Sequence, residues 1–222
     1  MVINVTNELV KTKGVILKTM DFKEKDKLVY IFTEDMGKMT LICKGARGKS
    51  SRFASSVMPL NICNFVVFTG KNIHNLNEIN VINTFPELKT DYEILTYALY
   101  FLELCDIAMS DGEVNNPYFL DLVKSLFLLE SKSIDIKVLA RAFELKTLIR
   151  TGNFPDPEIH GGRMSNVARS IVRFMMNKGL EELVGLKTTD KDLAEVEMLT
   201  EEMIKENFQR KPKSLDILKE EF

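Results

Sequence analysis

The residues best suited to chemistry lie in one short basic segment, residues 44–52. Its two glycines let the backbone adopt positive φ and approach a ligand closely. Cationic and hydroxyl side chains are the groups that contact phosphate oxygens in nucleic acids. The segment has two serines and no acidic residue, and its cations are Lys44, Arg47, Lys49 and Arg52. It predicts a surface for a polyanion; the alternative is a solvated loop that is basic by chance, because short basic runs are weak signals.

The charge of the chain is unevenly distributed. The 222 residues have a net charge of -2, but residues 1–80 hold 12 basic and 7 acidic residues, a charge of +5. The remainder holds 18 basic and 25 acidic residues, a charge of -7. A basic part joined to an acidic part suggests a polyanion partner for the first and a different partner for the second. Hydrophobic residues at 45% and charged residues at 28% are typical of a globular chain that buries its own core.

The cysteines and histidines do not predict a metal site. Cys43, Cys63 and Cys105 form no C-x-x-C pair, and the two histidines, His74 and His160, lie far apart. Zinc sites built from these residue types need closer spacing, so no metal is expected. Few, scattered cysteines are typical of a reducing cytoplasm, where each serves as a small buried hydrophobe.

No catalytic constellation stands out either. The sequence has no Walker-type phosphate loop and no paired carboxylates at a catalytic spacing, so we expect neither an enzyme nor a cofactor. Asp21 and Glu24 are possible ligands of a scattered hydrolase metal site, although a solvated charged turn explains them more simply. The N-terminus lacks a signal-peptide pattern, and no apolar run approaches membrane-spanning length. We therefore expect a soluble, cytoplasmic protein with no membrane partner.

Residues 1–85 are expected to form a small barrel. Residues 20–26 form a charged connection, and Gly37, two residues after Asp35, predicts a hairpin turn. Five strands with a long insertion between the third and the fourth are typical of an OB-fold, a barrel that avoids free sheet edges by closing. The five expected strands are residues 11–19, 28–33, 38–44, 58–69 and 73–84.

Four aromatic residues of this domain are candidates for stacking on bases. OB-folds bind single strands in a positive groove with aromatic platforms. The alternative for each is a place in the core, where most strand aromatics lie. The candidates are Tyr30, Phe32, Phe53 and Phe65, and Phe53 is preferred because it follows Arg52 in the basic segment.

Residues 86–222 are expected to form an all-α helical domain, which makes the fold class α+β. Apolar residues recur at helical spacing in six stretches, and the pattern is typical of a helical bundle. Ser165 is expected to cap the fourth helix, and Thr189 or Asp190 the fifth. The expected helices span residues 86–109, a stretch from 116 onward, 134–151, 165–179, a stretch from 190 onward and 214–221. Surplus apolar surface here suits the capture of a partner peptide.

Several segments of the chain carry a specific pattern. In the N-terminal part they are KGVIL at 13–17, EKD at 24–26, FTEDMGK at 32–38, KGAR at 44–47 and SR at 51–52. Further on they are YFLEL at 100–104, FELK at 143–146, GNFP at 152–155 and RKPKSL at 210–215. Together they resemble the RecO family of recombination mediators over most of the chain.

The resemblance implies an N-terminal OB-fold and a helical domain. It also implies binding of single- and double-stranded DNA, annealing of complementary strands, and partnership with RecR and the C-terminal tail of the single-strand-binding protein SSB to load RecA. It places the protein in the cytoplasm, at the nucleoid. By position, Lys44, Arg47, Lys49 and Arg52 hold the DNA backbone. The track is extended by Lys11, Lys13, Lys18 and Lys38.

One departure from the family pattern concerns zinc. Many relatives insert a four-cysteine zinc module after the Gly-x-x-Pro stretch, whereas residues 153–165 contain no cysteine and are too short to hold one. We therefore expect a DNA-binding recombination mediator without that module. Two alternatives stay open: an OB-fold scaffold that binds proteins but no DNA, and the hydrolase with a scattered metal site.

Overall fold

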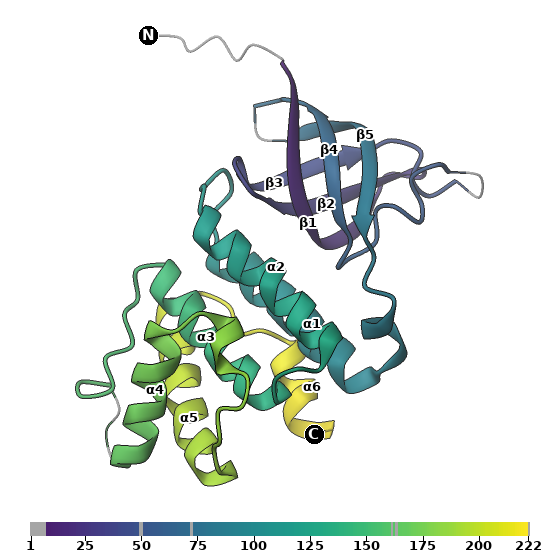
Figure 1. Ribbon diagram of the computed structural model, residues 1–222. Helices are drawn as coiled ribbons and strands as arrows, with labels where there is room; N and C mark the ends of the chain where they lie inside the picture. Colours follow the sequence, from purple (N-terminus) through teal and green to yellow (C-terminus); the bar gives the residue numbers. More distant parts are fainter. Residues whose placement is uncertain (1–7, 49–50, 72, 161, 163, 222) are drawn as a thin grey trace, which may run out of the picture. The chain divides into compact units, whose positions relative to one another are not determined.

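The computed structural model describes residues 8–48, 51–71, 73–160, 162 and 164–221 (Figure 1). The chain forms two compact units. One unit contains the described residues up to Phe85 together with Met109–Phe119, and the other contains Pro86–Ala108 together with the described residues from Leu120 onward. The sequence-based division places residues 109–119 in the helical domain, whereas their contacts are with the barrel.

The first unit is a closed barrel of five strands. They follow the order β1-β2-β3-β5-β4, with β4 returning to β1 (Figure 1). All neighbouring pairs are antiparallel except β3 and β5, which are parallel. This is the topology of an OB-fold, so the predicted fold class is confirmed. The strands are β1 (Leu9–Phe22), β2 (Asp26–Thr33), β3 (Gly37–Cys43), β4 (Ile62–Phe68) and β5 (His74–Asn83).

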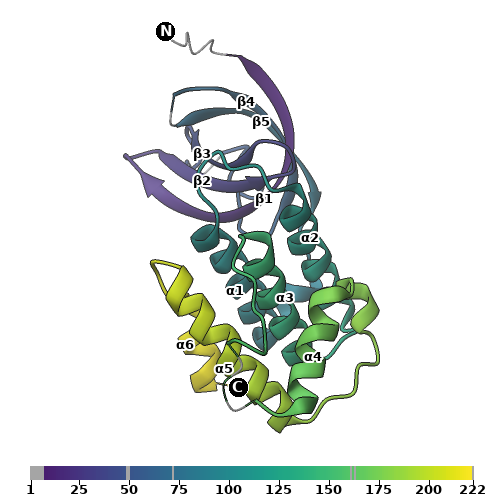
Figure 2. The same ribbon diagram turned by 90° about the vertical axis from the view of Figure 1, so that its left-hand side faces the viewer.

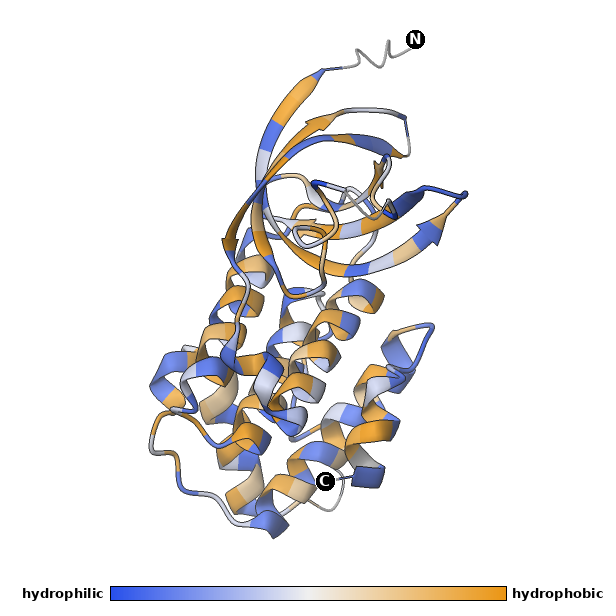
Figure 3. Cartoon of the chain, turned by 90° about the vertical axis from the view of Figure 1, so that its right-hand side faces the viewer, coloured by the Kyte–Doolittle hydropathy of each residue, from blue (hydrophilic) through white to orange (hydrophobic). Residues whose placement is uncertain are grey.

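The barrel core follows from the alternation of side chains along each strand. Met39, Leu41 and Cys43 share one face of β3, as predicted, and all three are buried in the core. Hydrophobic and hydrophilic residues alternate along the strands (Figure 3). The core residues from the other strands include Ile16, Val29, Ile31, Phe65 and Val67.

Residues 109–119 cover part of the barrel's outer surface. Phe32 follows the core residue Ile31 and therefore points outward, yet its side chain is fully buried. Its ring lies 5.7 Å from the ring of Tyr118 and 5.8 Å from that of Phe119. The backbone N–H of Gly112 donates to the carbonyl of Lys38 at 2.8 Å, which ties the same segment to β3.

The second unit is built around one central helix, α3 (Ile136–Arg150). Every residue from Val138 to Leu148 is buried, and α1, α4 and α5 all pack against α3 (Figure 2). The remaining elements are η1 (Glu87–Thr90), α1 (Tyr92–Ala108), α2 (Asn116–Ser131), α4 (Asn166–Asn177), η2 (Leu180–Leu183), α5 (Asp190–Asn207) and α6 (Ser214–Glu221).

The helix starts are fixed by side-chain caps. The Ser165 hydroxyl accepts from the backbone N–H of Ala168, and the Thr189 hydroxyl accepts from that of Asp192, which confirms both predicted caps. The N-terminus of α6 is capped from α1 instead, because the Glu103 carboxylate accepts from the backbone N–H groups of Lys213 and Ser214 at 3.0 and 2.9 Å.

Candidate nucleic-acid interface

The basic segment follows β3 and lies beside the tip of the β1–β2 hairpin. The two strands pair as far as Phe22 and Asp26, so residues 23–25 form the turn. The expectation that residues 20–26 are a connection is therefore wrong for its first three residues and for Asp26, which belong to the strands. Since Lys27 pairs with Cys43 at the end of β3, the chain leaves the sheet next to this turn.

Four contacts fasten the basic segment to the hairpin. The backbone N–H of Gly45 donates to Oδ1 of Asp26 at 2.9 Å, and that of Arg47 donates to the carbonyl of Lys25 at 3.0 Å. The Arg47 guanidinium donates through Nη1 to the carbonyl of Lys23 at 2.7 Å. Its Nη2 lies 3.2 Å from Oδ2 of Asp21. The segment is thus attached to the barrel from its first residues.

The apolar residues of the same connection are anchored in the barrel core. Ala46 and Val57 are buried among the core side chains, and Phe53 packs against them while half-buried. The Asn61 amide donates to the carbonyls of Ser55 and Ser56 at 3.2 and 3.0 Å. The described cations of the connection therefore lie on a backbone that is fixed at several points.

The predicted loop cations have different surroundings. Lys44 is exposed, and Arg52 is exposed with its guanidinium 4.6 Å from the centre of the Phe53 ring. Arg47 is 37% exposed, and its guanidinium is held by Asp21 and the carbonyl of Lys23. Lys49 lies outside the described residues. Of the three described cations, Arg47 is the one that pairs with a carboxylate, because its guanidinium lies 3.2 Å from Asp21.

Three of the four track lysines lie among acidic residues elsewhere on the barrel. Lys13 is 3.1 Å from Glu34, and Lys38, whose side chain is 11% exposed, is 3.5 Å from Asp111. Lys11 and Lys13 line a hollow of about 660 Å³ that also contains Glu34, Asp35 and Glu78. At about 3.3 Å per residue, Lys38 and Lys44 are about 20 Å apart along the strand. The structure therefore does not bring Lys11, Lys13 and Lys38 to the basic segment.

The fourth track lysine, Lys18, lies midway along β1. Its Nζ is 4.5 Å from the centre of the half-buried Tyr30 ring on the outer face of the barrel.

Sequence reasoning missed three lysines at the hairpin tip. Lys23 and Lys25 are exposed in the turn, and Lys27 is half-buried on β2. The register could have revealed them: Thr33 pairs with Gly37 across the predicted turn, and continuing that pairing places residue 26 opposite residue 44. Our prediction treated the turn as a charged connection and did not extend the pairing.

Two of the four stacking candidates were wrong. Phe65 is fully buried in the barrel core, and Phe32 is fully buried against Tyr118 and Phe119, so neither offers a face to a base. Tyr30 and Phe53 are half-buried, each with a cationic group over its ring, and stay predictions.

The cysteines of the barrel are shielded from chemistry. Burial raises the pKa of the Cys43 thiol to about 11 and that of Cys63 to about 12. Such thiols carry almost no thiolate near neutral pH, so they act as small hydrophobes.

Metal-assisted chemistry gains no support from the acidic residues near the hairpin. Asp21 is engaged by Arg47, and across the described ranges no group of three or more His, Cys, Asp or Glu side chains is arranged to hold a metal ion. Among the described helices, none has the length and apolarity needed to cross a membrane.

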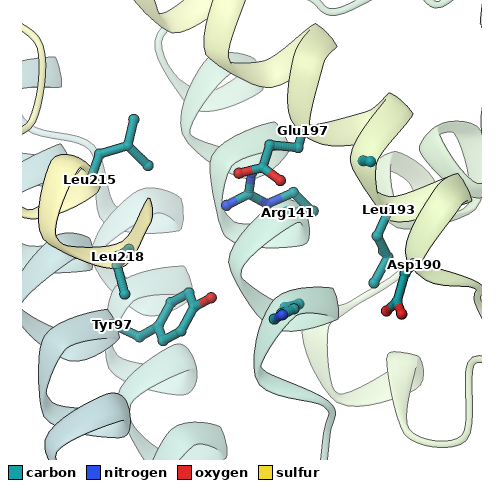
Figure 4. A pocket seen from close by; sticks show the side chains of 9 residues that line it. Tyr97, Arg141, Asp190, Leu193, Glu197, Leu215 and Leu218 are labelled. Atoms are coloured by element: carbon teal, nitrogen blue, oxygen red, sulfur yellow. The ribbon is translucent and has the colours of Figure 1, made fainter. Parts of the chain in front are cut away.

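The helical unit has a separate pocket of about 260 Å³. Figure 4 shows Arg141 of α3 facing Glu197 of α5, with leucines from α5 and α6 around them. Nη1 of Arg141 is 3.0 Å from Glu197 and its Nη2 is 3.0 Å from the fully buried Glu144. The other lining residues are Tyr97, Lys137, Asp190, Leu193, Ala194, Leu215 and Leu218. An apolar wall beside charged groups of both signs suits a peptide better than a polyanion.

Comparisons with known proteins bear on both units. The family model described as "Recombination protein O N terminal" matches residues 7–85, and "Recombination protein O C terminal" matches residues 89–158. The chain belongs to the RecO family. It is 32% identical to the DNA repair protein RecO of Clostridium novyi, over 93% of this chain and 92% of the relative. It is 35% identical to the DNA repair protein RecO of Clostridium perfringens strain 13, over 95% of this chain and 98% of the relative.

An arginine contacts several backbone groups between α3 and α4. Nε of Arg169 donates to the carbonyl of Met164 at 3.1 Å and its Nη2 to that of Gly162 at 3.0 Å. Its Nη1 donates to the carbonyl of Pro157 and pairs with Glu158. One guanidinium on α4 thus satisfies three backbone carbonyls of residues 153–165 in this RecO family member.

Proposed function

We propose that this chain is a non-enzymatic, DNA-binding recombination mediator. Its membership of the RecO family supports a role in DNA repair and recombination. In this proposal it binds single- and double-stranded DNA, anneals complementary strands and, with RecR, helps to load RecA onto DNA coated by SSB. It works in the cytoplasm, on the DNA of the nucleoid.

One observation carries the proposal: exposed cations gather at one end of an OB-fold barrel. Lys44 and Arg52 come from the β3–β4 connection, and Lys23 and Lys25 come from the adjacent hairpin turn. OB-folds bind single strands through such positively charged surfaces with aromatic residues beside them. Here the aromatic residue is Phe53, under the Arg52 guanidinium.

The physical basis of annealing is charge neutralisation. Two complementary strands repel each other through their phosphates, and bound cations lower that repulsion while counterions are released. A surface that contacts phosphates and not base edges accepts any sequence, as a mediator requires. No group that breaks a covalent bond is needed for this function.

The test is DNA binding by a variant that lacks the four loop cations. Replacing Lys44, Arg47, Lys49 and Arg52 by Ala should weaken binding to single strands of every sequence. The slope of log K against log salt should fall by about 0.7 for each phosphate that the variant no longer neutralises. The matched control replaces four exposed lysines of the helical unit, Lys187, Lys191, Lys205 and Lys213. Equal binding by wild type and the loop variant would contradict the proposal.

The OB-fold scaffold is the second candidate, and one observation favours it. Lys13, Lys38 and Arg47 each pair with a carboxylate of the chain, which reduces the positive potential of the barrel. In that case the wild type shows no salt-dependent binding to DNA, so the same titration separates the two functions. Sensitivity of any activity to a chelator would instead favour the hydrolase.

We propose RecR and the C-terminal tail of SSB as protein partners, with the helical unit as the docking module for the tail. The support is its acidic composition, which is unsuited to DNA, and the pocket beside Arg141 (Figure 4). Lys137 is the exposed cation on the pocket's rim. Reversing its charge with Lys137→Glu should weaken tail binding, whereas Lys191→Glu, an exposed lysine outside the pocket, should not. Equal effects of the two changes would exclude this pocket.

A further inference from the structure

Arg47 makes three contacts with the β1–β2 hairpin. A guanidinium has five N–H donors in a fixed planar arrangement. Here Nη1 binds the carbonyl of Lys23 at 2.7 Å and Nη2 lies 3.2 Å from Asp21, while the backbone N–H of Arg47 binds the carbonyl of Lys25 at 3.0 Å. All three partners belong to the β1–β2 hairpin. Two of the five guanidinium N–H donors and the backbone N–H are therefore directed at the hairpin, so an arginine in this position orients the segment that carries it.

Asp26 fixes the beginning of the same segment. Its Oδ1 accepts from the backbone N–H of Gly45 at 2.9 Å. Gly45 has a φ of 69°, a conformation that turns the chain sharply just after Lys44. The Asp26 carboxylate is close enough to Cys43, the last residue of β3, to help raise the pKa of its thiol, after the larger effect of burial. Asp26 therefore holds the exit from β3 in one direction.

An acidic residue at this place has two opposite effects on DNA binding. Its negative charge repels phosphates, so its loss should tighten binding if charge alone matters. Its hydrogen bond positions Lys44 and the residues after it, so its loss should loosen binding if position matters. The two effects have opposite signs, which makes them separable by experiment.

We propose that Asp21, Asp26 and Arg47 form a clamp that joins the basic segment to the hairpin turn. The clamp presents one composite phosphate-binding surface, made of Lys23 and Lys25 on the turn and Lys44 and Arg52 on the segment. Arg47 and the two aspartates are positioning residues, and the four other cations contact the nucleic acid. This inference rests on the proposed DNA-binding function and reassigns Arg47 within it.

The geometry explains why the surface needs both parts. Lys23 and Lys25 are exposed in a two-stranded hairpin turn, and Lys44 is exposed where β3 ends next to it. Neither part alone offers more than a few cations. Joined by the clamp, they place cations from two chain segments on one end of the barrel, so that a single strand can meet both.

The decisive comparison is Asp26→Asn against Asp26→Ala in the full chain. Both changes remove the same negative charge, but only asparagine keeps an oxygen that can accept from Gly45. We expect Asp26→Asn to bind a fluorescent oligothymidine as tightly as wild type or more tightly. Asp26→Ala should bind about three- to tenfold more weakly, as expected for the loss of one ordinary hydrogen bond.

Two further variants test the assignment of roles. Arg47→Lys keeps the positive charge but loses the planar set of guanidinium donors. If Arg47 is a clamp residue, this variant should bind DNA nearly as weakly as Arg47→Ala. If Arg47 binds phosphate directly, Arg47→Lys should keep most of the DNA affinity of the wild type. Replacing both Lys23 and Lys25 by Ala should lower the salt slope by about 1.4, or about 0.7 for each phosphate that is no longer neutralised. The control pair, Lys187 and Lys191 on the helical unit, should leave the slope unchanged.

The outcomes are distinguishable. If the wild type shows no salt-dependent binding to DNA, the proposed function is wrong, and so is the proposed phosphate-binding surface. If the wild type binds but Asp26→Ala and Asp26→Asn tighten binding equally, the clamp alone is overturned. Amide hydrogen exchange without DNA gives an independent readout, because exchange at Gly45 and Arg47 should accelerate in Asp26→Ala and not in Asp26→Asn. Unchanged exchange in Asp26→Ala also overturns the clamp.

Discussion

Residues of one chemical type perform different tasks in this chain, and their partners decide which. Arg47 and Arg52 lie five residues apart in the same basic segment. Arg47 binds the hairpin through Asp21, whereas Arg52 stacks over Phe53 and stays exposed. The sequence could predict that both are cations on a surface segment. It could not separate them, because the partner that defines Arg47 lies 26 residues earlier and becomes its neighbour only when the hairpin closes.

Glu144 is the buried acid on which the helical core depends. It is fully buried and accepts from the hydroxyls of Tyr100 at 2.6 Å and Thr200 at 2.5 Å, while Arg141 lies 3.0 Å away. Burial raises the pKa of Glu144, and the Arg141 guanidinium and the hydroxyls of Thr200 and Tyr100 oppose that rise. A periodic apolar pattern predicts helix α3 but gives no sign that this glutamate faces the core.

Glu144→Ala should therefore cost much more stability than an ordinary surface change. It leaves Arg141 buried without its main partner, and breaking such a pair costs about 3–5 kcal/mol. Urea unfolding measures the loss. The control Glu202→Ala, at an exposed position on α5, should stay within about 0.5 kcal/mol of wild type. Equal losses for both variants would show that the network contributes nothing beyond the packing of its neighbours.

At the scale of elements, local signals predicted most of the structure. Alternation located five strands, and the Ser165 and Thr189 caps located two helix starts. Contacts between residues that are far apart in the sequence could not be predicted. The cap of α6 comes from Glu103, which is about 110 residues away in sequence. The contacts that Arg169 makes with the carbonyls of Pro157, Gly162 and Met164 were also not predicted.

Arg169 should be the residue that holds the stretch after α3 in place. Its guanidinium donates to the carbonyls of Pro157, Gly162 and Met164, so Arg169→Ala leaves three acceptors without that donor. We expect faster proteolysis between residues 154 and 165 and a loss of about 1–3 kcal/mol in unfolding free energy. Arg173→Ala is the matched control, because Arg173 lies one turn later on α4 and pairs with Glu158. Proteolysis that is equally fast in both variants would contradict the role of Arg169, and a chelator should change neither.

At the scale of the whole molecule, the barrel is completed by a segment from beyond the first helix. Residues 109–119 cover Phe32 and bind β3 through Gly112, although α1 separates them in sequence from the strands. A boundary drawn where strands give way to helices cannot show this, because residues 109–119 carry no strand pattern. The apolar outward position of Phe32 was the one available sign, and we had interpreted it as a stacking platform. A fragment that ends at residue 85 would expose this surface.

The contribution of residues 109–119 to the barrel can be tested at Gly37. Its φ is 69°, and a Cβ there would overlap the backbone carbonyl of Glu113 in the covering segment. Gly45 has the same φ of 69° with nothing within 4 Å of a Cβ. Both Gly→Ala changes therefore carry the same backbone strain, about 1–2 kcal/mol for a left-handed residue, and only Gly37→Ala also displaces residues 109–119.

The difference between the two variants isolates the contribution of the covering segment. We expect Gly37→Ala to lower the unfolding free energy in urea by at least about 1 kcal/mol more than Gly45→Ala, because moving the segment uncovers Phe32, Tyr118 and Phe119. Dye binding to newly exposed apolar surface should rise only in Gly37→Ala. If the two variants are equally stable and bind no dye, residues 109–119 lie on the barrel without stabilising it, and a fragment ending at residue 85 should then fold by itself.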